Sequence, residues 1–149
     1  MGVDVLFAES IVRAKKRIPV MTMELIGGDG EHILIVEDEE VLRQLGVRTL
    51  SVLGYSAVAV ASGEEAVRYL ENNQVHLVML DMQMAPGING RETYERILAV
   101  RPGQRAIIVS GYADSVEINR TLELGASQLV RKPYTLQELE LAVKAAMSG

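Results

Sequence analysis

The stretch His76-Leu77-Val78-Met79-Leu80-Asp81 decides how this 149-residue sequence is interpreted, because an apolar run ends there abruptly on a carboxylate. The run from Val75 to Leu80 follows Asn72-Asn73 and precedes a stretch that contains proline and glycine. A short apolar run with such boundaries is typical of a strand buried on both faces of a parallel sheet. We therefore expect Asp81 at the carboxyl end of a strand, where open α/β sheets bind their ligands.

Three other apolar runs end on polar residues in the same way. They are His32–Val36 before Glu37 and Asp38, Ala106–Val109 before Ser110 and Gly111, and Gln128–Val130 before Arg131, Lys132 and Pro133. Parallel neighbouring strands bring their carboxyl ends to one edge of a sheet. The sequence thus predicts that acidic, hydroxyl and amine groups converge on that edge.

Apolar residues recur at helical spacing between these runs, so strands and helices alternate five times along the chain. We expect strands at residues 32–36, 56–61, 75–81, 106–110 and 127–130. Asp38 is expected to cap the first helix and Gly54 to end it, while Ser62 and Glu65 have the spacing of a capping box. This alternation predicts right-handed βαβ units and an α/β fold with a parallel sheet.

Composition limits the kind of protein further. The net charge of −5 disfavours a nucleic-acid partner, and the absence of cysteine excludes disulfides and thiolate metal sites. No stretch approaches the roughly 20 apolar residues of a membrane span, and the N-terminus is not a secretory signal, so a cytoplasmic location is expected. Residues 1–30 are expected to form a tail or linker, and residues 31–149 the compact domain.

The polar groups at the strand ends suit one kind of chemistry. Glu37, Asp38 and Asp81 repel one another when packed together, and Mg²⁺ offsets such repulsion because it prefers oxygen ligands. The Lys132 ammonium balances the same cluster and can pair with an incoming anion, and Ser110 adds a hydroxyl. The set suits transfer of a phosphoryl group onto a carboxylate, since cations neutralise the transferred oxygens while the carboxylate acts as nucleophile.

Each of these residues also has an ordinary structural interpretation. A lone aspartate at a strand end is more often a helix cap than a nucleophile, and the acidic run 37–40 alone suits the start of a helix. Ser110-Gly111 alone is a turn, and Lys132-Pro133 alone is a strand exit. Their order at the ends of consecutive strands favours the functional interpretation.

With these motifs in order, residues 31–148 resemble the receiver domain of two-component response regulators. The matching segments are 36–39 after the first strand, Asp81 after the third, Ser110-Gly111 after the fourth and Lys132-Pro133-Tyr134 after the fifth. The resemblance implies a doubly wound (βα)5, flavodoxin-like three-layer sandwich with strand order 2-1-3-4-5.

The resemblance also implies a role for each site residue. Asp81 would be the phospho-acceptor, and Glu37, Asp38, Asp81 and the backbone carbonyl of Gln83 would hold Mg²⁺. Ser110, Gly111 and Lys132 would bind the phosphoryl group, with a cis peptide bond between Lys132 and Pro133.

Two departures from the family pattern stand out. The proline expected four residues after the acceptor is replaced by Ala85, with Pro86 following, so this loop is one residue longer. The aromatic residue expected three positions before the lysine, which reorients with the active-site hydroxyl as a switch alongside Ser110, is Leu129. Phosphoryl chemistry is expected to persist, while Leu129 departs from the family's aromatic readout.

The implied function is a signalling switch that catalyses its own aspartyl phosphorylation and dephosphorylation. Its partner would be a sensor histidine kinase or a histidine phosphotransfer protein, and a homodimer is compatible with it. The chain would be a stand-alone regulator or the C-terminal receiver of a hybrid kinase. Alternatives are a pseudo-receiver that only binds proteins, or a Mg²⁺-dependent aspartyl phosphatase. The phosphatase is disfavoured because Gln83 occupies the place of its second aspartate.

Overall fold

The computed structural model describes residues 27–84, 87–111 and 116–148, in which strands and helices alternate five times. In chain order they are β1 (His32–Val36), α3 (Glu40–Val52), β2 (Ser56–Val60), α4 (Gly63–Asn72), β3 (Leu77–Asp81), α5 (Gly90–Val100), β4 (Ala106–Ser110), α6 (Val116–Glu123), β5 (Gln128–Arg131) and α7 (Leu136–Met147). All neighbouring strands are parallel, in the order β2-β1-β3-β4-β5. The predicted doubly wound fold and its strand order are confirmed.

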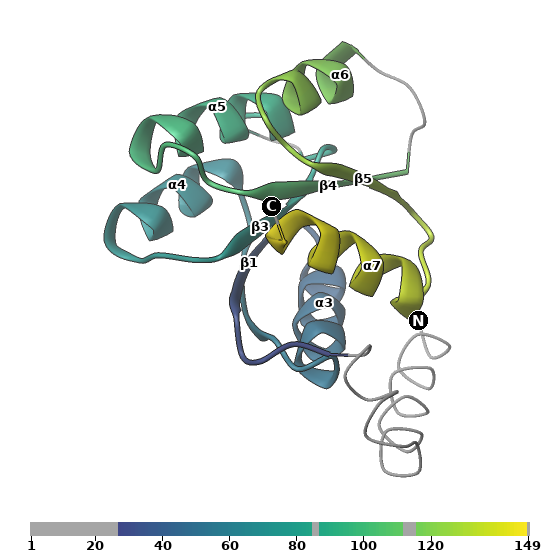
Figure 1. The fold of residues 1–149 in the computed structure, drawn as a ribbon. Helices are drawn as coiled ribbons and strands as arrows, with labels where there is room; N and C mark the ends of the chain where they lie inside the picture. The colour runs from purple at the N-terminus through teal and green to yellow at the C-terminus, as the bar shows by residue number, and fades with distance from the viewer. Residues whose placement is uncertain (1–26, 85–86, 112–115, 149) are drawn as a thin grey trace, which may run out of the picture.

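The sheet is covered by helices on both faces, as Figure 1 shows. Successive strand residues point to opposite faces, so each strand serves two cores. Ile33 and Ile35 pack with residues of α3 and α7, whereas Leu34 and Val36 pack with residues of α4, α5 and α6. Both cores are needed to bury strands such as β3, in which every residue is buried. This explains why β3 is a continuous apolar run in the sequence.

The start of α3 corrects one prediction. The cap position is Glu39, whose side chain makes no capping hydrogen bond, so the expected cap on Asp38 is wrong. The Asp38 carboxylate instead lies with those of Glu37 and Asp81. Arg43 of α3 holds this turn, because its Nη1 donates to the backbone oxygens of Glu37 and Asp38, each at 2.9 Å.

The caps of α4 and α5 also differ in detail from the expectation. The Ser62 hydroxyl accepts from the Glu65 N–H at 3.1 Å as predicted, but the Glu65 carboxylate accepts from Ala61, one residue before the cap. A complete capping box, which was not predicted, opens α5 between Asn89 and Glu92. It fixes the point at which the chain returns to a helix after β3.

The strand boundaries move by one or two residues at most. β3 begins at Leu77 rather than at residue 75, β2 ends at Val60, and β5 is shifted to Gln128–Arg131. Their carboxyl ends still bring Asp81 and Ser110 to the same edge, so the predicted convergence survives these shifts. Residues 1–26, with most of the expected tail, and the loop residues Ala85 and Pro86 lie outside the described residues.

Residues 27–30 are attached to the domain rather than forming a free joint. The Gly28 N–H donates to Leu53 O at 2.6 Å, and the Gly30 N–H donates to Gly54 O at 2.8 Å. Gly54 has a φ of +95°, which glycine adopts readily, and ends α3 as predicted. The chain therefore enters the domain along the end of α3.

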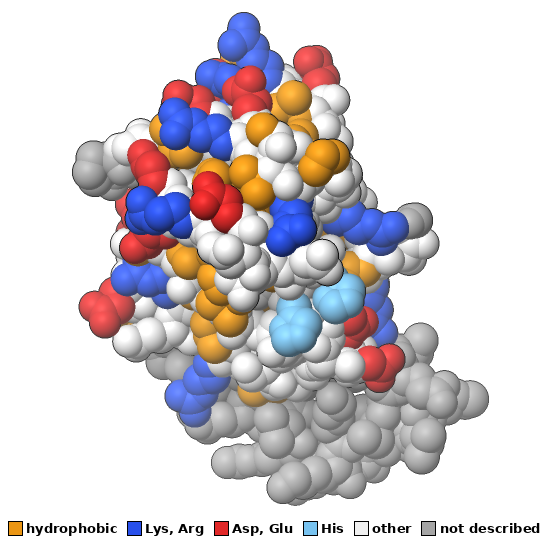
Figure 2. Space-filling view, turned by 90° about the vertical axis from the view of Figure 1, so that its left-hand side faces the viewer, with side chains coloured by type: hydrophobic (Ala, Val, Ile, Leu, Met, Phe, Trp, Pro, Cys, Tyr) orange, Lys and Arg blue, Asp and Glu red, His pale blue; other side chains and the backbone are white. Residues whose placement is uncertain are grey.

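The amino ends of β1 and β3 carry the two histidines of the chain, which lie side by side on the surface in Figure 2. The rings of His32 and His76 stack with centroids 6.0 Å apart, and the His32 N–H donates to His76 Nδ1 at 2.9 Å. None of the helices in the described ranges has the length and apolar character needed to cross a membrane.

Candidate functional site

The register of the sheet assembles the site. Val36 pairs with Leu80, Asp81 with Val109, and Ser110 with Arg131. Asp81 and Ser110 end their strands, and Glu37 and Lys132 directly follow theirs. All four residues therefore lie at the same edge of the sheet. Carboxylates, a hydroxyl and an ammonium from four strands are placed together there, as the sequence predicted.

Three carboxylates form the centre of the site. Oxygens of Glu37, Asp38 and Asp81 all lie within 4.8 Å of one another, with Glu37 and Asp81 buried and Asp38 exposed. Backbone N–H groups orient the buried pair. Glu39 donates to Glu37 Oε2 at 3.2 Å, and Gln83 donates to Asp81 Oδ1 at 3.0 Å. The two buried carboxylates are thus held in fixed directions by the turns that follow β1 and β3.

Lys132 supplies the positive charge of the site. Its Nζ lies 3.1 Å from Glu37 Oε1 and 3.4 Å from Asp81 Oδ2. The Lys132 N–H donates to Ser110 O at 2.9 Å, so the lysine backbone is tied to the end of β4. The Lys132–Pro133 peptide bond is cis, as the resemblance implied. One ammonium therefore bridges the two buried carboxylates.

The titration behaviour follows from this packing. Burial and the neighbouring Asp81 charge raise the pKa of Glu37 to about 7. Burial acts to lower the pKa of Lys132, but the charges of Asp81 and Glu37 outweigh it and the pKa is raised above its ordinary value. Lys132 therefore stays charged near neutral pH, and Glu37 is close to its midpoint without a further cation.

The remaining predicted residues occupy two different places. Ser110 is fully buried at the end of β4, Gly111 follows it on the surface, and Gln83 is exposed two residues after Asp81. Leu129 is not at the site. It pairs with Ile108 in the sheet and packs with the core formed by α4, α5 and α6.

Gly90 contributes to the site in a way that the sequence analysis missed. A Cβ on Gly90 would lie 2.6 Å from Met82 Sδ and 3.2 Å from Asp81 O, so the start of α5 packs directly on the end of β3. Any larger residue would push on the backbone of the central carboxylate. The spacing of Asn89 and Glu92, typical of a capping box, was the available signal that a helix starts here.

The donor set fits a hard divalent cation. Three carboxylates with converging oxygens outnumber the one ammonium that contacts them among the described residues, so the cluster keeps excess negative charge. Carboxylate and carbonyl oxygens are the ligands that Mg²⁺ prefers in proteins. Fold and site together define a doubly wound α/β domain with an acidic, lysine-bridged centre at its carboxyl edge.

Comparison with known proteins identifies the class. The family model of the response regulator receiver domain matches residues 33–144, and the chain belongs to that family of two-component signalling. The chain is 33% identical to sporulation initiation phosphotransferase F of Bacillus subtilis, over 76% of this chain and 91% of that protein. It is 35% identical to sensor kinase CckA of Brucella abortus, over 89% of this chain and 14% of that protein.

A solved structure agrees with the fold and carries a metal. The receiver domain of the sensor histidine kinase PA1611 from Pseudomonas aeruginosa, with a magnesium ion in its active-site cleft, superposes with a TM-score of 0.72. It shares 26% sequence identity, over 80% of this chain and 99% of that domain. The chain spans less than half of the length of several other curated relatives.

Proposed function

We propose that this receiver domain takes a phosphoryl group from a phosphohistidine onto the carboxylate of Asp81. The observation that carries the proposal is the setting of that carboxylate. It is 5% exposed, with Oδ1 held by the Gln83 N–H and Oδ2 facing the Lys132 ammonium. A carboxylate fixed in this way is oriented for nucleophilic attack.

The surrounding residues would bind Mg²⁺ and the phosphoryl group. Glu37, Asp38, Asp81 and the backbone carbonyl of Gln83 would hold Mg²⁺, which supplies neutralisation of the phosphoryl oxygens when bound. Lys132 binds the same oxygens as a point charge, Ser110 donates its hydroxyl to them, and the lack of a side chain at Gly111 leaves their approach uncrowded.

In the phosphoryl transfer, the bond that forms at Asp81 is matched by a bond that breaks in the donor. The Asp81 oxygen forms a bond to phosphorus while the nitrogen–phosphorus bond of the donor breaks, and its electron pair stays on the imidazole nitrogen. Hydrolysis of the acyl phosphate by water later returns the carboxylate and releases inorganic phosphate. The domain thus catalyses both steps on itself, and occupancy of Asp81 switches its conformation through Ser110.

The similarity to CckA supports a place in a hybrid kinase or phosphorelay. Its alignment spans 136 residues and so extends beyond the family match at residues 33–144. The donor is then a sensor histidine kinase or a histidine phosphotransfer protein, in the cytoplasm, and the receiver acts alone or as a homodimer. A pseudo-receiver is disfavoured by the complete set of acids, hydroxyl and lysine.

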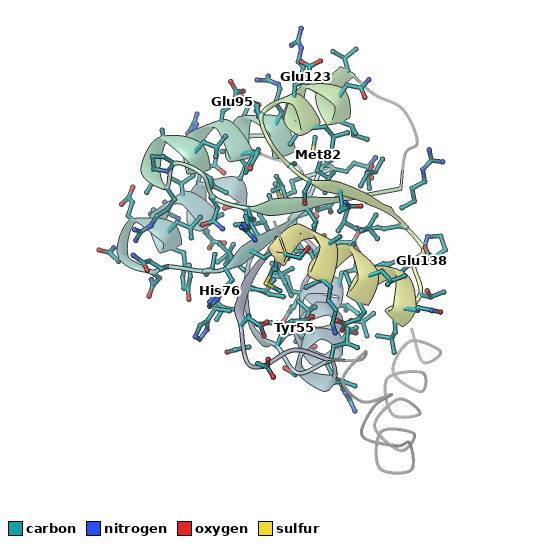
Figure 3. The ribbon with its side chains drawn as sticks, viewed as in Figure 1. Tyr55, His76, Met82, Glu95, Glu123 and Glu138 are labelled. Carbon is teal, nitrogen blue, oxygen red and sulfur yellow. The ribbon has the colours of Figure 1, made fainter. Side chains whose placement is uncertain are left out.

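The test is intact-mass measurement after incubation with acetyl phosphate and Mg²⁺. One phosphoryl group should be added, and Asp81→Asn or a chelator should abolish it. Glu123→Gln, the same carboxylate-to-amide change on the exposed end of α6 (Figure 3), should leave labelling intact. Full labelling of the Asp81 variant would refute the proposal.

A further inference from the structure

A buried polar pair lies toward the edge of the sheet opposite to the phosphoryl site. The Tyr55 hydroxyl donates to Glu140 Oε1 at 2.7 Å, and both residues are 5% exposed. Tyr55 precedes β2 at the end of α3, and Figure 3 shows it below the middle of α7, the helix that carries Glu140. The bond therefore joins the two helices on one face of the sheet.

This pair is costly to disturb. Burial and the contact with Glu140 raise the pKa of Tyr55 far above its ordinary value, so its hydroxyl remains a donor. Among the described residues no donor reaches Glu140 Oε2, and Lys144 Nζ lies 3.8 Å from Oε1. A buried carboxylate with so few partners depends strongly on each one that it has.

A cavity of about 490 Å³ lies between the first turn of α7 and α3. The cavity is lined by Glu37, Asp81, Lys132 and Tyr134 next to the site, and by Leu42, Leu45, Leu136 and Leu139 from the two helices. Close packing normally holds a helix in one position, and a void gives it room to shift. Only residues 133–135 separate Lys132 from this turn, so a shift of α7 would act on the lysine side chain even though its backbone N–H stays bonded to Ser110 O.

The chain enters the domain across the same pair. Gly28 lies so close to Tyr55 that a Cβ on Gly28 would be 2.2 Å from the ring atom Cε1. The hydrogen bonds from Gly28 and Gly30 to the end of α3 hold this segment in place. Residues 27–31 thus cover the ring, and their displacement would admit water to the bond with Glu140.

We propose that Tyr55 and Glu140 are positioning residues for Lys132, under the control of residues 27–31. The pair fixes α7 against the sheet, and α7 holds the lysine opposite Asp81. Displacement of residues 27–31 frees α7 to shift into the cavity and weakens phosphoryl binding. The inference rests on the proposed function, because it assigns the Lys132 ammonium to the phosphoryl group.

Matched variants separate positioning from general loss of stability. Tyr55→Phe removes only the hydroxyl, and Tyr94→Phe removes an equally buried one on the other face, where it donates to Gln104 O at 2.7 Å. Gly28→Ala pushes the entering chain off Tyr55. Gly103→Ala is the control for a glycine-to-alanine change: it strains the backbone at a φ of +81°, where no atom lies within 4 Å of the added Cβ, and so displaces no neighbour.

The measurements are the affinity for beryllofluoride with Mg²⁺, and amide exchange in the first two turns of α7. Tyr55→Phe and Gly28→Ala should each weaken the affinity about tenfold and speed this exchange. The controls Tyr94→Phe and Gly103→Ala should leave the beryllofluoride affinity unchanged. They should speed amide exchange in α7 only as far as they lower the global stability. Glu140→Gln should keep near-native affinity, because its amide oxygen still accepts from Tyr55.

Native beryllofluoride affinity in Tyr55→Phe, or an equal loss in Tyr94→Phe, would overturn the inference. If Tyr55→Phe fails to fold, the comparison of Gly28→Ala with Gly103→Ala decides the same question. If the wild-type protein does not bind beryllofluoride, the proposed function fails. Amide exchange in α7 then still decides whether Tyr55 anchors that helix.

Discussion

Replacement of Lys132 by alanine tests how the charges of the site are balanced. At an effective dielectric constant of about 20, a pair of unit charges separated by 3.1 or 3.4 Å, as Lys132 is from Glu37 and Asp81, interacts by about 5 kcal/mol. The net loss is much smaller, since the variant no longer desolvates an ammonium and Glu37 can take up a proton. We expect Lys132→Ala to lower the free energy of unfolding by about 2 kcal/mol at pH 7.5.

The loss of unfolding free energy in Lys132→Ala should grow as the pH rises. The folded-state pKa of Glu37, about 7, exceeds its ordinary value of 4.5, so the folded chain holds a proton that the unfolded chain has released in this window. The contribution of Glu37 to the free energy of unfolding therefore falls as the pH rises from 4.5 to 7. It should fall further in Lys132→Ala, because the ammonium no longer stabilises the Glu37 carboxylate. The difference between wild type and variant should be smaller at pH 5.5 than at pH 7.5.

Urea denaturation at both pH values, with and without Mg²⁺, measures this difference. Added Mg²⁺ should narrow it, because a divalent cation replaces the missing charge, and Mg²⁺ affinity should be retained or rise. Beryllofluoride binding should weaken sharply. Arg120→Ala is the control, since it removes an exposed cation 3.9 Å from Glu117. Wild-type beryllofluoride binding, or a larger stability loss at pH 5.5, would refute the reasoning.

Three other predictions concern separate parts of the domain. Gly90→Ala should lower the unfolding free energy by about 1–3 kcal/mol and weaken Mg²⁺ binding, because its Cβ would press on Met82 and Asp81 O; calorimetry and metal titration measure both. Beryllofluoride should change amide exchange at Ser110 and Gly111 but barely at Leu129, since leucine gains little from reorienting; the reverse pattern would contradict this. A chain that starts at Glu31 should melt several degrees below one that starts at Gly27, because it loses two hydrogen bonds and the cover of Tyr55.

The strand pattern made most of the fold and of the site predictable. Strands buried on both faces of the sheet appear in the sequence as continuous apolar runs. The ligand-binding edge of the sheet appears as the polar residues that follow these runs, such as Asp81, Ser110 and Lys132. These signals are local in the sequence, so periodicity and residue type suffice to find them. The order of the strands came from the resemblance, since periodicity does not fix which strands are neighbours.

Features that depend on contacts between distant segments were not predictable in this way. Asp38 suits a helix cap by its type and position, yet the turn that Arg43 holds through the Asp38 backbone oxygen places its carboxylate beside those of Glu37 and Asp81. The bond between Tyr55 and Glu140 joins residues 85 positions apart. Neither residue belongs to a motif, so only the packing of α7 over α3 reveals the pair.

The alternation of side chains along each strand divides the interior into two cores that the sheet separates. Leu129 faces one core and Val130 the other, and the same holds for Leu34 and Ile35. Substitutions in different cores remove different contacts, so their effects on stability should add where the side chains lie far apart. The two cores can therefore be varied largely separately, although both are needed to bury a strand such as β3. The core with α4, α5 and α6 can diverge toward new partners while the core with α3 and α7, which borders the cavity beside Lys132, is kept.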